Sequence, residues 1–157
     1  MTEREIYVRN WIERVSVIRE ELKGFSICPF ASRSFYKIVE CKISDIQPET
    51  GYDLVIFIVE DHLSECEIQN YIEKYNKIYS EWEFLEDCVF RNTYIGEVQT
   101  NNGKYNLILA QPLEKLREYR KKLAKTEYYS LWSDEYLRKI LQDDYEIVKK
   151  PVEVEFS

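Results

Sequence analysis

Apolar residues recur every three or four positions in four stretches of the chain, and this spacing predicts four helices. The first helix is expected over residues 3–22. The second opens at Ser64, and its apolar stripe runs through residues 68–85. A third is expected over residues 112–125, because proline suits the first helical turn. The fourth begins after Ser133, which is a favoured capping residue.

Four other stretches predict β-strands. Residues 35–44 alternate between apolar and polar, and residues 53–60 are almost continuously apolar, as in a strand buried on both faces. Residues 88–100 and 104–111 predict two more strands, joined by a turn at Asn102-Gly103. The order of elements predicts an α+β fold: a two-layer sandwich with a four-stranded, mostly antiparallel sheet and helices packed mainly on one face.

The length of 157 residues fits a single domain, residues 1–157, built around one core. No shift in composition marks a domain boundary. The tail, residues 145–157, is expected to be loosely ordered, and its alternating stretch 152–156 predicts either an edge strand or a disordered end.

Charge is unevenly distributed along a chain whose net charge is −7. Residues 61–87 hold eight acidic and two basic side chains, whereas residues 112–125 hold six basic and two acidic ones. An acidic chain repels nucleic acid and anionic membranes, so neither is the favoured partner. No apolar run reaches about 18 residues and the N-terminus lacks a signal-peptide core, so we expect no membrane contact and a cytoplasmic location.

The cysteines predict neither disulfides nor a metal site. No two of them form a Cys-x-x-Cys pair, and without a secretory signal free thiols are the expected state. The single histidine, His62, does not complete a set of zinc ligands with the usual spacing. We therefore expect no metal and no cofactor. The four cysteines are Cys28, Cys41, Cys66 and Cys88.

Residues 22–36 connect the first helix to the first strand and contain the most reactive candidate, Cys28. Pro29 fits the first position of a short helical turn, which makes Cys28 the residue that caps it. The positive end of such a turn lowers the pKa of a thiol. Cys28 is thus a candidate nucleophile or redox group, with Arg33 near by and His62 as the available imidazole. The preferred alternative is a small buried hydrophobe beneath the first helix.

The same region carries a resemblance to known proteins. Residues 1–60 resemble a bacterial family known only as a domain of unknown function, whose members join a tryptophan-bearing helix to an Asn-Leu-Cys-Pro-Phe-Ala motif. The family's later His-Pro and Asn-Arg-Ser-Pro motifs have no counterpart here. The resemblance therefore implies a similar start to the fold and no particular activity. The matching residues are Trp11, Ile27, Cys28, Pro29, Phe30 and Ala31.

Basic and aromatic residues alternate between positions 115 and 132. Such a pattern can contact single-stranded nucleic acid or an acidic protein. The alternative is a solvated face whose positive charges pair with the acidic residues 61–87, either within the fold or across a dimer. The candidate binding residues are Arg117, Arg120, Lys121, Tyr128, Tyr129 and Trp132.

The sequence contains no complete catalytic constellation. We therefore predict first a binding or accessory protein that acts through protein–protein contacts, either as a homodimer or with another protein. The alternative is a thiol-dependent enzyme or redox protein that uses Cys28. A weaker alternative is nucleic-acid binding through residues 115–132.

Overall fold

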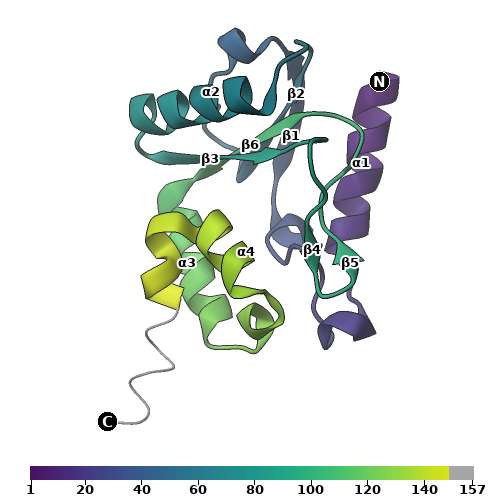
Figure 1. Cartoon of the computed structure of the whole chain (residues 1–157), viewed down its shortest axis with the longest axis vertical. Helices are drawn as coiled ribbons and strands as arrows, with labels where there is room; N and C mark the ends of the chain where they lie inside the picture. Colours follow the sequence, from purple (N-terminus) through teal and green to yellow (C-terminus); the bar gives the residue numbers. More distant parts are fainter. Residues whose placement is uncertain (149–157) are drawn as a thin grey trace.

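The structure is a computed structural model of the chain, and it describes residues 1–148 (Figure 1). Its main sheet has four strands in the order β1-β2-β6-β3, and a separate two-stranded hairpin is formed by β4 and β5. The α+β fold predicted from the sequence is confirmed. The helices are α1 (Glu3–Ser16), α2 (Glu65–Ile78), α3 (Leu113–Ala124) and α4 (Asp134–Leu141). The strands are β1 (Tyr36–Cys41), β2 (Leu54–Val59), β3 (Trp82–Asp87), β4 (Tyr94–Ile95), β5 (Val98–Gln99) and β6 (Leu107–Pro112).

The sheet is mixed, with one parallel and two antiparallel pairings. Strands β1 and β2 run parallel, with Tyr36 opposite Leu54 and Cys41 opposite Val59. The connection 42–53 is long enough to return to the start of the sheet, which a parallel pair requires. Its Ile43 and Ile46 are buried against the same face of the sheet as α2. On its other side β2 pairs with β6, and this pairing is antiparallel.

Strand β2 is the centre of the core, since all six of its residues are buried. Successive side chains of a strand point to opposite faces. Ile56 therefore packs on the α1 face, together with Val8 and Ile12. Phe57 packs on the other face, together with Ile68 of α2.

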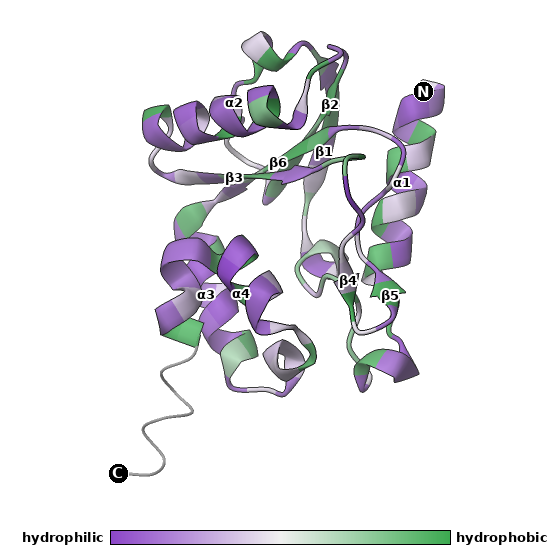
Figure 2. Ribbon diagram, viewed as in Figure 1, coloured by the Kyte–Doolittle hydropathy of each residue, from purple (hydrophilic) through white to green (hydrophobic). Residues whose placement is uncertain are grey.

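The helices cover both faces of the sheet rather than mainly one. Figure 1 shows α2 above the sheet, α3 and α4 below it, and α1 to the right of the sheet. The helices carry both hydrophobic and hydrophilic residues along their length (Figure 2), as expected of helices that cover a sheet on one side and face water on the other. The prediction of a single covered face was wrong because a central strand that is apolar on both sides needs cover on both sides.

Two helices are shorter than the sequence pattern indicates. Helix α1 ends at Ser16, and the chain then forms a short bridge between Arg19 and Phe25. Helix α2 ends at Ile78, and the predicted continuation to residue 85 is strand β3 instead. The capping predictions are confirmed: the Ser64 hydroxyl accepts a hydrogen bond from the backbone N–H of Glu67, and the Ser133 hydroxyl from that of Tyr136.

The long connection between β3 and β6 replaces the hairpin expected at Asn102-Gly103. Two buried asparagines organise it. The Asn101 carboxamide accepts from the backbone N–H of Thr93 and donates to the backbone carbonyl of Cys88. The Asn102 carboxamide accepts from the backbone N–H of Tyr105 and donates to the carboxylate of Asp87. The expected edge strand or disordered end at residues 152–156 lies outside the described residues.

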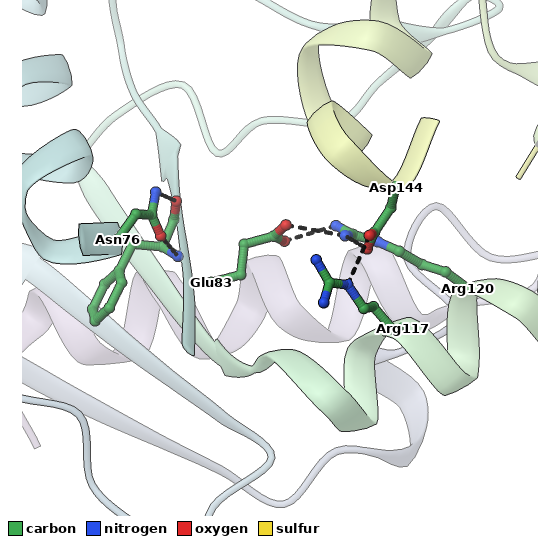
Figure 3. A network of polar contacts seen from close by, with 6 residues as sticks. Asn76, Glu83, Arg117, Arg120 and Asp144 are labelled. Carbon is green, nitrogen blue, oxygen red and sulfur yellow. Dashed lines mark hydrogen bonds and ion pairs between the residues drawn. The ribbon is translucent and has the colours of Figure 1, made fainter. Parts of the chain in front are cut away.

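Strand β3 is an edge strand, and a side chain of α2 covers part of its free edge. The Asn76 carboxamide accepts from the backbone N–H of Phe84 at 2.8 Å and donates to the backbone carbonyl of the same residue at 3.2 Å (Figure 3). Asn76 thus takes the place of a neighbouring strand at this position. An edge whose backbone groups are satisfied is a poor template for pairing with another chain.

Replacing Asn76 by alanine is expected to lower the free energy of unfolding by about 1–2 kcal/mol, because two part-buried backbone groups lose their partner. The matched control is Asn70→Ala, an exposed position of the same helix, where we expect a change within about 0.5 kcal/mol. Urea denaturation measures both. Equal effects of the two substitutions would show that the contact with Phe84 contributes nothing.

Candidate functional site

A cavity of about 230 Å³ is lined by residues from both faces of the sheet, among them Trp11 of α1 and Ile72 of α2. Ile56 and Leu109 form its wall on the sheet, and Trp11 forms part of its wall on α1. Trp132 and Tyr136 close it from the side of the C-terminal helices. An apolar cavity of about 150 Å³ is large enough to bind benzene, so this space can hold a small organic molecule.

The cavity lies where two separately packed parts of the core meet. One part joins α1 to the sheet, and the other joins α3 to α4 through the short helical turn Tyr128–Leu131. Phe25 and Trp132 pack against both parts. Large aromatic rings lie at this junction, and the Trp132 ring contacts that of Tyr136 with a centroid separation of 4.5 Å.

Cys28 borders this cavity, and its environment bears on the pKa of the thiol. Burial raises its pKa, whereas the backbone N–H groups of Ala31 and Phe30 and the charge of Arg120 act in the opposite direction. The helical turn therefore does lower the pKa of the Cys28 thiol, as expected, but desolvation raises this pKa by more. The prediction of a lowered pKa was wrong for this reason, and the thiol stays protonated at neutral pH.

The other proposed members of a thiol site are elsewhere. His62 is exposed beyond the carboxyl end of β2 and is not among the residues that border the cavity. Arg33 is exposed as well, and it borders a second, separate hollow with Asp53 and Lys115. The structure thus does not bring Cys28, His62 and Arg33 together.

Three tyrosines line the cavity, and they differ in how their hydroxyl groups are satisfied. The Tyr128 hydroxyl donates to the backbone carbonyl of Ile27 at 2.5 Å, and the Tyr136 hydroxyl lies 3.4 Å from that of Thr100. Tyr129 is 6% exposed, and its hydroxyl has no hydrogen-bond partner among the described residues. Burial raises the pKa of all three, that of Tyr136 to about 12, so each is a neutral phenol at physiological pH.

Arg120 borders the cavity and belongs to a group of paired charged side chains, which Figure 3 shows. Arg120 of α3 is 2% exposed and donates to both carboxylate oxygens of Glu83, at 3.0 and 2.7 Å. It also donates to the carboxylate of Asp144 at 2.7 Å, and Arg117 donates to the same carboxylate at 2.8 Å. Burial lowers the pKa of Arg120, but Glu83 and Asp144 outweigh this and raise it. We call these four residues the Arg120 cluster, and its formal charges cancel.

Asp87 is a half-buried acidic residue that borders the cavity. Its carboxylate accepts hydrogen bonds from the backbone and side chain of Asn102. Burial raises its pKa to about 6, although Asn102 and the charge of Arg14 act against this.

The candidate basic and aromatic residues are turned mostly inward. Arg120, Tyr128 and Tyr129 are buried, Trp132 is half-buried, and Arg117 is held by Asp144. Lys121 is exposed on the outer side of α3 and lies 3.7 Å from Glu118. The structure thus uses most of this set to build the cavity and the Arg120 cluster rather than an exposed nucleic-acid surface.

Several residues of the site carry no recognisable signal in the sequence. Glu83 and Asp144, the partners of Arg120, lie in segments that the sequence pattern assigns to helices or to a tail. Tyr136 and Leu109 read as ordinary apolar positions of a helix and a strand. The polar pairing of Glu83 with Arg120 has a weak signal in the opposite charges of residues 61–87 and 112–125.

The remaining findings bear on metals, thiols and membranes. All four cysteines are free, and no group of three or more His, Cys, Asp or Glu residues within 1–148 is placed to hold a metal ion. Among the helices of the same residues, none is both long and apolar enough to cross a bilayer.

Comparison of the chain with protein-family models, curated proteins and solved structures finds no match. The resemblance of residues 1–60 to the uncharacterised bacterial family therefore stays a prediction. The function has to be argued from the site itself.

The two neighbouring tyrosines offer a matched test of the site's geometry. Tyr128→Phe is expected to lower the free energy of unfolding by about 1–3 kcal/mol, because the buried carbonyl of Ile27 loses its donor. Tyr129→Phe removes a buried hydroxyl that bonds to none of the described residues, so the free energy of unfolding is expected to stay the same or to rise by up to about 3 kcal/mol. Urea denaturation followed by circular dichroism measures both. A loss at Tyr129 as large as that at Tyr128 would contradict the description.

Proposed function

We propose that the protein is a binding protein that takes a small, mostly apolar molecule into the cavity between the sheet, α1 and the C-terminal helices. The observation that carries the proposal is a volume of about 230 Å³ lined mostly by apolar side chains, several of them aromatic. A ligand that fills this space removes apolar surface from water, which is favourable.

The chemistry of the wall supports binding over catalysis. The thiol of Cys28 is kept protonated by burial, and the exposed His62 does not border the cavity and so supplies no base to it. The phenols of Tyr128, Tyr129 and Tyr136 are neutral for the same reason. Such groups position and recognise a ligand, whereas nucleophilic catalysis needs an activated nucleophile with a base within reach.

Protein–protein contact, the function first predicted from the sequence, is a second candidate. The observation that favours it is a set of exposed apolar side chains in the connection after β3: Val89, Phe90 and Tyr94 are 40–49% exposed. Phe90 also borders the cavity. A partner protein that covers these residues would lie near the ligand, and this role stays a prediction.

Naphthalene tests the proposal, since it is apolar, rigid and small enough for the cavity. We expect it to bind with a Kd on the order of 10–100 μM in isothermal titration calorimetry. Leu109→Phe places additional volume at the sheet wall and is expected to weaken binding at least tenfold. The control is Ile78→Phe, a comparable enlargement at a position that is 56% exposed and lies on α2.

Binding of naphthalene that is equally strong in the parent, Leu109→Phe and Ile78→Phe proteins would place the ligand outside the cavity. Failure of the parent protein to bind it at all would remove the proposal.

A further inference from the structure

The cavity is bordered by two residues with a buried polar atom that lacks a hydrogen-bond partner among residues 1–148: the hydroxyl of Tyr129 and the indole N–H of Trp132. Tyr129 is more than nine-tenths buried, and its hydroxyl has no hydrogen-bond partner among residues 1–148. Tyr128, its neighbour in sequence, uses its hydroxyl within the fold. Buried hydroxyl groups are nearly always paired, and one without a partner costs about 1–3 kcal/mol.

Tyr129 is one of the residues that border the cavity, as are Arg120 and Cys28. The Tyr129 ring stands nearly perpendicular to that of Trp132, at 81° and a centroid separation of 5.1 Å. The indole and phenol rings thus form a mostly apolar corner with two unpaired hydrogen-bonding groups, the Tyr129 hydroxyl and the Trp132 indole N–H.

The charges near this corner already have partners. Arg120 is paired with Glu83 and Asp144, and the carboxylate of Asp87 accepts from Asn102. A formal charge on a ligand would be buried here without a counterion, which costs several kcal/mol. The other charged residues that border the cavity are partly or fully exposed: Glu65, Glu86, Arg91 and Lys139.

We infer that the natural ligand is a neutral molecule of one or two rings that carries a hydroxyl, carbonyl or amide group, and that this group pairs with the hydroxyl of Tyr129. The rings pack against Trp132 and Tyr136, where edge-to-face contacts between aromatic groups are favourable. A tyrosine hydroxyl both donates and accepts, so it serves each of these polar groups. The inference rests on the proposed function and adds the chemical class of the ligand to it.

The test compares 2-naphthol with naphthalene, which differ by one hydroxyl group. In the parent protein and in Tyr129→Phe, the Kd of each compound is measured by isothermal titration calorimetry. The ratio of the Kd of 2-naphthol to that of naphthalene is expected to rise about 5- to 20-fold in Tyr129→Phe, because the hydroxyl of 2-naphthol loses its partner. The control Tyr94→Phe, at a residue that is 49% exposed and does not border the cavity, is expected to leave the ratio unchanged.

The outcomes separate the two claims. If naphthalene binds in the cavity but the ratio stays the same in Tyr129→Phe, the inference fails and the proposed function stands. If neither compound binds the parent protein, both fail. Should Tyr129→Phe not fold, intermolecular nuclear Overhauser contacts in the parent complex decide instead. We expect contacts between the Tyr129 ring and the protons beside the hydroxyl of 2-naphthol, and their absence from a well-resolved complex would overturn the inference.

Discussion

The buried guanidinium of Arg120 fixes the position of the C-terminal helices on the sheet. It bonds to Glu83 on the edge strand β3 and to Asp144 in the turn that follows α4. A buried ion pair adds little net stability compared with apolar residues of the same size, but loss of one partner costs about 3–5 kcal/mol. The Arg120 cluster therefore fixes the relative positions of α3, α4 and the sheet more than it adds stability. These elements have one arrangement in which all of its charges are paired. The width of the cavity follows from that arrangement.

The aromatic residues then keep the space open. Trp132 contacts the rings of Tyr128, Tyr129 and Tyr136 at centroid separations between 4.5 and 5.6 Å. Tyr128 is anchored through its hydroxyl to the carbonyl of Ile27, beside Cys28. Rings that hold one another in edge-to-face contact cannot turn into the cavity without breaking those contacts. Cys28 and the Cys-Pro stretch thus serve the site as part of its wall.

Features set by nearby residues could be predicted from the sequence, and features set by distant ones could not. The capping hydroxyls of Ser64 and Ser133 act on backbone groups three residues away, and both were predicted. Strand β3 was mistaken for helix because Trp82 and Leu85 continue the apolar spacing of α2, while the burial of Phe84 against that helix depends on tertiary packing. The same holds for the site. Cys28 stands out through its neighbour Pro29, but the partners of Arg120 lie 37 and 24 residues away along the chain.

The central claim is that an apolar space accessible to small molecules persists between the sheet and the C-terminal helices. A crystal structure determined under xenon pressure tests it most directly, because xenon occupies apolar cavities without requiring polar contacts. The account predicts a xenon atom in contact with Leu109 and Trp132, near the hydroxyl of Tyr129. A structure in which Trp132 packs directly against Leu109 and no xenon is found between them would contradict it.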